Sequence, residues 1–467
     1  MKLYNTLTRQ IDTLKPLQDN IVKIYTCGIT VYSHPHIGNW VGYIYWDVLQ
    51  RALLAEGYQV ERTQNFTDVG HLTSDDDNGE DKMEKGAKAE GLTAWDVAER
   101  YIEICDSESD SLNLLKPTHL IRATSLIQQQ IDFVSKLEEK GYVYSIPEDG
   151  IYFDTSKLDD YGKLARLDIA GLEAGARVSV EGKKNITDFA LWKFSPKDSK
   201  RDMQWESPWG LGFPGWHLEC SVIARQTLGD QIDIHCGGID HIPVHHTNEI
   251  AQTESLTGKK PFSQIWVHNN HVKVDGTKMS KSIGNIYTLD DIIAKGYSPM
   301  DFKMLVLSKH YRTEGNFTWE ILEAAHNRLQ NWRNIASLRW QALPGTQTSN
   351  INYDEQLNDL NTKLKEDLDT PGALALIDES FSKINVTITP EEQTGFSTFL
   401  ESIDSLLGLD LCGSTPNISP EIEKTLADRS KARADKNWAE SDKLRTELNN
   451  LGLEVKDTPT GQIWSYI

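Results

Sequence analysis

Two short stretches, far apart in the chain, carry residues suited to chemistry on a phosphate. The sequence HIGN at residues 36–39 follows an apolar run that we expect to be a strand, residues 21–25, and precedes a run expected to be a helix, residues 40–54. Backbone N–H groups at such a helix N-terminus attract anions. A HIGN sequence by itself means little, but KMSKS at residues 278–282 adds two lysines on a loop. Together the stretches predict nucleotidyl transfer, in which cationic groups stabilise the charge gathering on a phosphorus under attack.

A second set of residues has the types that bind zinc: two thiols, an imidazole and a carboxylate. They are Cys27, Cys220, His245 and Glu249. His245 and Glu249 stand four residues apart on an expected helix, so they face the same way. The spacing leaves open whether these residues form a metal site or whether the thiols are buried apolar groups beside a surface pair. It also leaves His246 and Cys236 as competing ligands.

The elements that must position these residues are parallel strands. Strand-like runs at residues 58–66, 232–235 and 265–268 each end in polar residues, and the first delivers Thr67 and Asp68. Strands that alternate with helices indicate an open α/β sheet, in which ligands bind at the carboxyl ends of the strands. The sequence therefore predicts a doubly wound, Rossmann-type domain that carries both motifs.

Bulk composition excludes several classes of protein. The 467 residues are 39% hydrophobic, and no apolar run approaches the roughly 18 residues of a membrane span. Five scattered cysteines indicate a reducing compartment rather than a disulfide framework. The net charge of −21 argues against nonspecific nucleic-acid binding. We expect a cytoplasmic protein with no membrane partner.

The chain divides by pattern into five segments. They are 1–115, the first half of the α/β domain; 116–205, an insertion; 206–299, the second half; 300–420, a helical bundle; and 421–467, a small α+β domain. One helix is expected from Ile422 to Leu451. Six basic and three acidic residues lie between Arg429 and Arg445, which locally reverses the sign of the chain's charge.

Two other patterns have ordinary interpretations. An acidic stretch at residues 74–81 could be read as a calcium loop, but it lacks the terminal bidentate glutamate, and we expect a solvated loop. Trp192, Trp205 and Trp209 are expected to be packing residues, whereas Trp216 opens the helix that carries Cys220.

Taken together, the motifs resemble the class I aminoacyl-tRNA synthetases, and within them the cysteinyl-tRNA synthetase family, over essentially the whole chain. The matching segments are YTCGITVYSHPHIGN, TQNFTD, GWHLECS, GGIDH, HHTNEIAQ, KVDGTKMSKSIGN, SKHYRT and DKNWAESD. The resemblance implies a split Rossmann-type catalytic domain, a helical bundle and a C-terminal anticodon-binding domain.

The resemblance also implies roles for individual residues. The zinc ligands would be Cys27, Cys220, His245 and Glu249. Catalysis would fall to His36, Asn39, Lys278 and Lys281, and ATP would also contact Gly38 and Asp240. Cysteine would contact Gly28, Thr67 and Trp216, and the anticodon would meet Arg433, Trp438, Asp442 and Asp457.

The implied activity is that of a cysteine–tRNA ligase. The cysteine carboxylate attacks the α-phosphate of ATP, giving cysteinyl-adenylate, and a terminal ribose hydroxyl of tRNA(Cys) then takes the cysteinyl group. One Zn²⁺ per chain would bind the substrate thiolate and so reject serine, because a hydroxyl is a harder ligand. Mg²⁺ would accompany ATP, and the enzyme is expected to act as a monomer.

This chain departs from the family pattern at three points: Asn39 ends the HIGH-type motif, VHHTNE replaces the usual PHHENE at residues 244–249, and the loop at 70–84 is longer and more acidic. Two alternatives stay open. A ligase that joins cysteine to an amino sugar should lack the segment 422–467. An RNA-binding protein with a decayed core should lack the lysine loop and the four candidate ligands.

Overall fold

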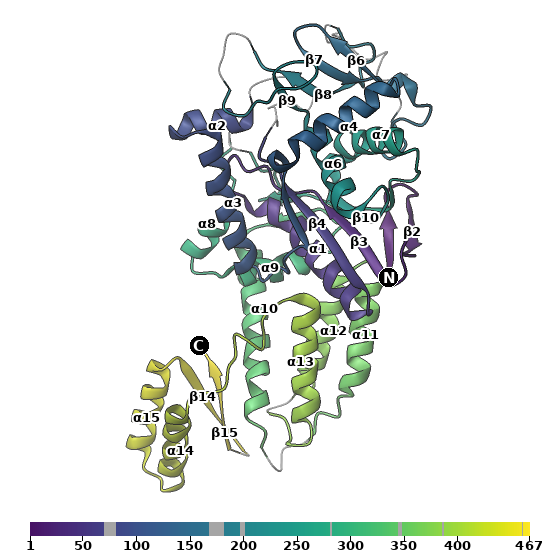
Figure 1. Cartoon of the computed structure of the whole chain (residues 1–467). Helices are drawn as coiled ribbons and strands as arrows, with labels where there is room; N and C mark the ends of the chain where they lie inside the picture. Colours follow the sequence, from purple (N-terminus) through teal and green to yellow (C-terminus); the bar gives the residue numbers. More distant parts are fainter. Residues whose placement is uncertain are drawn as a thin grey trace. The chain divides into compact units, whose positions relative to one another are not determined.

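A computed structural model describes residues 1–69, 81–167, 182–196, 201–280, 283–343, 348–384, 387–459 and 461–467. Its central element is a five-stranded parallel sheet in the order β11-β10-β3-β4-β5 (Figure 1). The strands are β3 (Ile21–Thr26), β4 (Gln59–Phe66), β5 (His119–Arg122), β10 (Ile232–Gly238) and β11 (Ser263–Asn269). The predicted α/β sheet is confirmed, and β5 lies within the segment 116–205 that we expected to be an insertion.

The turn after β3 leads directly into α1 (Ile37–Ala55), so the HIGN sequence forms the first turn of this helix. The Asn39 side chain accepts a hydrogen bond from the His36 backbone N–H at 2.9 Å. The Ile37 N–H donates to the Tyr287 carbonyl at 2.8 Å, which ties the turn to the segment that follows the lysine loop. The expected position of HIGN at a helix N-terminus is confirmed.

The chain segment that links β5 to β10 forms a separate antiparallel sheet of four strands, in the order β6-β7-β8-β9. Its strands are β6 (Val143–Ile146), β7 (Gly150–Phe153), β8 (Phe189–Phe194) and β9 (Gly212–Pro214). Phe153, Phe189 and Trp192 bury one face of this sheet against α4 (Ile127–Glu139) and α6 (Trp216–Leu228). Trp192 is fully buried, and Trp205 and Trp209 are partly buried against the same core, as expected of packing residues.

Further helices and short strands accompany the two sheets. They are β1 (Lys2–Asn5), β2 (Gln10–Thr13), α2 (Lys82–Glu90), α3 (Ala94–Ser111), η1 (Ala123–Leu126), η2 (Thr155–Lys157), η3 (Ile239–His241), α7 (His245–Thr257), β12 (Val272–Val274), α8 (Leu289–Ala294) and β13 (Gly315–Phe317). Most of the acidic stretch at 74–81 lies outside the described residues. Asp81 is described, and its carboxylate caps the N-terminus of α2.

The chain separates into two compact units. The first contains residues 1–46, 56–291 and 311–316, and the second contains residues 47–55, 292–310 and 317–467. Helix α1 is continuous across this division, because its residues 47–55 belong to the second unit. Among the described helices, none has the length and apolar character needed to cross a membrane.

The second unit is mostly helical. Its elements are α9 (Pro299–Leu307), α10 (Trp319–Ser337), η4 (Leu338–Trp340), α11 (Tyr353–Lys365), α12 (Thr370–Ser382), α13 (Gln393–Leu407), α14 (Pro420–Ala434), α15 (Trp438–Asn450), β14 (Leu453–Thr458) and β15 (Gly461–Tyr466). The prediction of one helix from Ile422 to Leu451 was wrong. Lys436 adopts a φ of 58°, which ends α14, and Asn437 then caps α15 by accepting from the Glu440 N–H.

A buried group of charges joins α1 to two helices of this unit. Asp47 Oδ2 lies 2.8 Å from Arg51 Nε and 3.0 Å from Lys303 Nζ, and all three side chains are buried. Arg51 also donates to the carbonyls of Asp404 and Ser405 near the end of α13. Because a buried ion needs partners, these contacts fix residues 47–55 within the helical unit.

The first turn of α1 rests on a buried carboxylate from α3. Trp40 Nε1 donates to Glu108 Oε2 at 2.5 Å, and His34 Nδ1 lies 3.6 Å from Glu108 Oε1. Burial raises the pKa of Glu108 to about 7, against the lowering effects of the Trp40 hydrogen bond and of His34. Folding therefore favours the protonated carboxyl at this position.

We predict that wild type loses unfolding free energy as the pH rises and that Glu108→Gln does not. A raised folded-state pKa gives stability that is present below the unfolded value near 4.5 and is lost as the pH rises through 7. Wild type should thus lose roughly 1–3 kcal/mol of unfolding free energy relative to Glu108→Gln between pH 4.5 and 8. Urea unfolding of both proteins at the two pH values measures this. Glu103→Gln, at an exposed position of the same helix, is the control, and an equal pH response in all three proteins would contradict the prediction.

Candidate active site and metal centre

The turn after β3 is held against the end of β4 by Asn65. The Asn65 amide oxygen accepts from the Gly28 N–H at 2.7 Å, and its amide nitrogen donates to Thr67 Oγ1 at 3.1 Å. A Cβ at Gly28 would stand 1.5 Å from the Asn65 carbonyl oxygen, so no other residue fits there. Asn65 lies in the TQNFTD motif, but its sequence context gave no sign of this positioning role. Asp68, at the end of the same motif, instead holds the N–H and hydroxyl of Thr124.

Beside this turn, the four predicted metal ligands converge. His245 Nε2 lies 3.4 Å from Cys220 Sγ and 3.2 Å from Glu249 Oε1, and Cys27 Sγ lies 3.9 Å from the same Glu249 oxygen. All four are buried, so His245 and Glu249 do not form a surface pair. The ligand atoms of this set lie within 4.8 Å of one another, which is close enough to share one ion.

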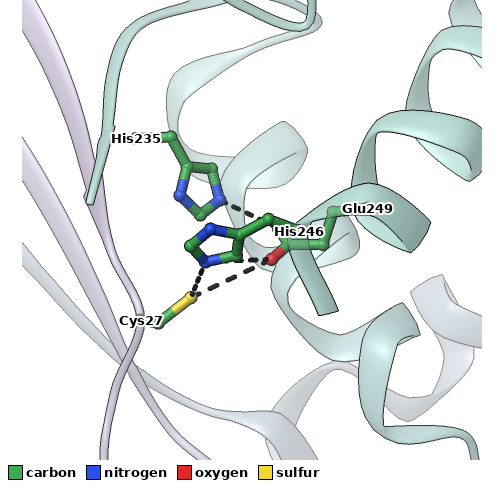
Figure 2. A group of neighbouring side chains, drawn as sticks. All are labelled: Cys27, His235, His246 and Glu249. Atoms are coloured by element: carbon green, nitrogen blue, oxygen red, sulfur yellow. Dashed lines mark hydrogen bonds and ion pairs between the residues drawn. The ribbon is translucent and has the colours of Figure 1, made fainter. Parts of the chain in front are cut away.

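A second set of four shares two members with the first. Figure 2 shows Cys27 and Glu249 together with His235, which comes from β10, and His246. His246 Nε2 lies 3.3 Å from Cys27 Sγ, and His235 Nε2 lies 2.9 Å from Glu249 Oε2. His246 therefore remains a competing ligand, as expected from the sequence. Cys236 belongs to neither set among the described residues.

The two sets differ in what they face. A cavity of about 580 Å³ opens beside the turn, and Cys27, Cys220 and His245 contribute to its wall. His235 and His246 do not contribute to that wall and are fully buried. The set with Cys220 and His245 is therefore the one that a ligand in the cavity can reach.

Buried hydrogen bonds hold the imidazoles in both sets. His217 Nδ1 lies 3.0 Å from His245 Nδ1, on the side of the ring away from Cys220. His246 Nδ1 lies 2.8 Å from His268 Nε2, and His268 Nδ1 lies 2.7 Å from Thr6 Oγ1. Contacts of this kind orient a metal-binding imidazole and fix its tautomer.

The charges of the first set suit a cation. Burial raises the pKa of the Cys220 thiol, but the hydrogen bond from Cys27 and the neighbouring His245 outweigh it and bring the value to about 6. Burial likewise opposes ionisation of Glu249, yet His235 and His245 lower its pKa to about 2. The pKa of Cys27 is raised, mainly by burial. Two anionic donors with a thiol and an imidazole, all removed from water, fit a soft divalent ion such as Zn²⁺.

The residues predicted to act on phosphate lie on the same cavity. His36, Gly38, Asn39 and Lys278 all contribute to its wall. A Cβ at Gly38 would stand 2.3 Å from Met279 Cε, so the glycine allows the lysine loop to approach the first turn of α1. Lys278 is exposed to solvent, and Lys281 lies outside the described residues.

The predicted substrate contacts also reach this cavity. Gly28, Thr67, Trp216 and Asp240 contribute to its wall. The Trp216 ring lies 4.4 Å, centroid to centroid, from the His245 ring, beside the first metal set. Asp240 Oδ1 lies 3.1 Å from Nε2 of His271, a residue that the motifs did not indicate.

The predicted anticodon residues belong to the second unit, where they lie on α14, α15 and β14. Arg433 Nη1 contacts Asp457 Oδ2 at 3.1 Å, and its guanidinium lies 5.6 Å from the Trp438 ring centroid. Trp438 is 55% exposed, and Asp442 is exposed on α15. Asp457 also receives a two-pronged hydrogen bond from the buried Arg429, which lowers the pKa of its carboxyl.

Two family descriptions match the sequence. Residues 13–327 match "tRNA synthetases class I (C) catalytic domain", and residues 415–464 match "Cysteinyl-tRNA ligase anticodon binding domain". The first covers more than half of the chain and includes both motifs and both metal sets. The second covers α14, α15, β14 and most of β15.

Named relatives match over nearly the whole chain. "Cysteine--tRNA ligase 1" of Burkholderia lata is 44% identical over 466 residues, covering 99% of this chain and 96% of that protein. "Cysteine--tRNA ligase" of Treponema denticola is 37% identical over 499 residues and covers 99% of each.

Among solved structures, the fold is similar to that of Mycobacterium tuberculosis methionyl-tRNA synthetase in complex with methionyl-adenylate. The TM-score is 0.60 at 15% sequence identity, with 84% of this chain and 92% of that chain covered. At this identity the likeness concerns the fold alone.

We predict that Cys220→Ala loses a bound metal ion that His246→Ala retains, because Cys220 faces the cavity and His246 is held by His268. The purified proteins should be compared by elemental analysis, with about one equivalent expected in wild type. Cys236→Ala, which alters a buried thiol outside both sets, is the matched control and should keep its metal. The reverse pattern, with loss only in His246→Ala, would assign the ion to the set in Figure 2.

Proposed function

The chain belongs to the cysteine–tRNA ligases of the class I aminoacyl-tRNA synthetases, and from this premise we propose how its residues select cysteine, activate it and charge tRNA(Cys). One observation carries the proposal. Thiol and imidazole donors, the HIGN turn and Lys278 all border one cavity, so a thiol-bearing amino acid and a nucleotide can meet there.

Cysteine selection falls to the cavity-facing metal set. Cys27, Cys220, His245 and Glu249 would hold one Zn²⁺, which when bound supplies a position that prefers a thiolate to a hydroxyl. The Trp216 ring lies beside His245, tilted against it, and would close the pocket around the side chain of the amino acid. Gly28 and Thr67, which Asn65 fixes at the strand ends, would contact its remaining polar groups.

Activation of cysteine depends on residues that bind the anionic phosphates of ATP. The cysteine carboxylate attacks the α-phosphorus of ATP, a phosphorus–oxygen bond to pyrophosphate breaks, and cysteinyl-adenylate forms. His36 and Asn39 at the N-terminus of α1, with Lys278 and Lys281, would stabilise the charge on the phosphate oxygens as the bond order changes. Gly38 would allow ATP to approach closely, and Mg²⁺ would accompany its phosphates. Asp240 would accept a hydrogen bond from a ribose hydroxyl of ATP.

Transfer completes the reaction. A terminal ribose hydroxyl of tRNA(Cys) attacks the carbonyl carbon of the adenylate, and AMP leaves. Arg433, Trp438, Asp442 and Asp457 would read the anticodon, because an exposed tryptophan beside a guanidinium can stack an unpaired base. The match of residues 415–464 to an anticodon-binding domain speaks against a ligase that joins cysteine to an amino sugar.

We also propose which segment of the chain performs each task. We assign catalysis to segments 1–115 and 206–299, an insertion to 116–205, the stem-contact region and bundle to 300–420, and anticodon binding to 421–467. We propose a monomeric enzyme of the cytoplasm.

We predict that Lys278→Ala slows cysteine-dependent ATP–pyrophosphate exchange by about two to three orders of magnitude, the usual loss for a group that stabilises transition-state charge. The KM for cysteine should barely change, because this lysine faces phosphate. Lys259→Ala, at an exposed ion pair with Asp230, is the control and should exchange normally. Serine should support little exchange with either protein. An unchanged rate in Lys278→Ala would remove this lysine from the mechanism, and a wild type without cysteine-dependent exchange would refute the activity.

We predict that Trp438→Ala raises the KM for tRNA(Cys) in charging about five- to fiftyfold, the range expected from loss of one stacked base. Arg433→Ala should act in the same direction but more mildly. Pyrophosphate exchange, which needs no tRNA, should be unchanged in both. Lys424→Ala on the exposed face of α14 is the control for loss of positive charge alone. If the variants discriminate among anticodon sequences as wild type does, these residues do not read the anticodon.

A further inference from the structure

The strand that precedes the lysine loop has a two-sided pattern. Val272 and Val274 of β12 are buried, and the half-buried His271 and Lys273 alternate with them along the chain. His271, Val272 and Lys273 all contribute to the wall of the cavity. The side chains of His271 and Lys273 are 39% and 38% exposed, so both can reach the space where the nucleotide is proposed to bind. Neither residue belongs to the KMSKS sequence.

The backbone of His271 is fixed on both sides. Its N–H donates to the Asn270 side-chain oxygen at 2.8 Å, and its carbonyl accepts from the Gly315 N–H at 2.8 Å. The Asn270 N–H donates in turn to the Tyr311 carbonyl at 2.8 Å. The imidazole of His271 thus projects from a segment held in place by three hydrogen bonds.

The partner of this imidazole is Asp240. The Asp240 side chain is 69% exposed and belongs to the short helix η3, which directly follows β10. His271 Nε2 lies 3.1 Å from Asp240 Oδ1. A contact at one carboxylate oxygen restricts the orientation of Oδ2, whereas an exposed aspartate without such a contact can adopt several rotamers.

We infer that His271 is a positioning residue that holds the Asp240 carboxylate in the orientation that accepts a ribose hydroxyl of ATP. The inference rests on the proposed function and deepens it, because it gives the nucleotide site a specificity element outside the two motifs. The physical basis is pre-organisation: a carboxylate ordered before ATP arrives does not have to be ordered by ATP binding.

A bare surface ion pair is the competing interpretation, since exposed pairs contribute little on average. The two interpretations differ in which substrate group the pair serves. If His271 acts through Asp240 on the ribose, its effect on the KM for the nucleotide depends on the presence of a ribose hydroxyl. If it only supports the local fold, its removal affects every nucleotide alike.

The experiment measures KM for ATP, 2′-deoxy-ATP and 3′-deoxy-ATP in cysteine-dependent pyrophosphate exchange by the full-length protein. His271→Ala should raise the KM for ATP about three- to tenfold, the factor expected for loss of one polar contact, with kcat and the KM for cysteine nearly unchanged. With the analogue that lacks the hydroxyl bound by Asp240, wild type and His271→Ala should become equal. His271→Gln, which retains a side-chain N–H, should recover part of the loss.

Two further variants separate the outcomes. Asp240→Asn should show the same dependence on the hydroxyl as His271→Ala, and the double variant should be no worse than Asp240→Asn alone. Lys273→Met, which removes a cation from the same face of β12 and from its pair with Glu314, should affect all three nucleotides by one common factor. A His271→Ala effect equal for all nucleotides, or an Asp240→Asn variant indifferent to both hydroxyls, would overturn the inference. Absence of exchange in wild type would refute the proposed function instead.

Discussion

The rest of this site depends on one constraint. Three groups that can become anionic are packed together away from water. Cys27, Cys220 and Glu249 come from the end of β3, from α6 and from α7, and burial opposes the ionisation of each. Charges removed from water need compensation, and here His235 and His245 provide it directly. This requirement explains why several histidines surround three short segments, and why His245 and His246 each have a second ring nitrogen held by another histidine.

The same crowding explains why two ligand sets coexist. A helix places residues three and four positions apart on one face, so His246 and His245 both lie beside Glu249. His246 and Glu249 in turn both contact Cys27. The direction of the cavity then distinguishes the sets, because Cys220 and His245 border it and His235 does not. His235 also influences the set that contains Cys220 and His245, because it contacts Glu249, which belongs to both sets. Its Nε2 lies against the second carboxylate oxygen of Glu249.

Much of the fold could be predicted from the sequence because strand ends and helix starts leave local signals. The α/β sheet, the helix behind HIGN and most helices of the bundle follow from apolar periodicity and from capping residues. The break at Lys436 was missed, because a charged residue with a positive φ has no distinctive local pattern. Asn65 and His271 were missed for a different reason: their partners lie 37 and 31 positions away, and long-range polar contacts leave no periodicity. The choice between His246 and His245 as ligand depends on which way a cavity opens, which spacing cannot encode.

Helix α1 also limits how this architecture can be divided by recombination. Its first turn carries HIGN, whereas Asp47 and Arg51 near its other end pair with Lys303 and with the carbonyls at the end of α13. A fragment that begins at residue 292 would contain the whole sequence of the helical bundle and tail but would leave the ammonium of Lys303 buried without its carboxylate, an arrangement that costs about 3–5 kcal/mol. A chimaera that exchanges the bundle between related enzymes must therefore transplant the second half of α1 with it. The helical unit is thus discontinuous in the sequence, and its first segment continues the helix that begins at HIGN.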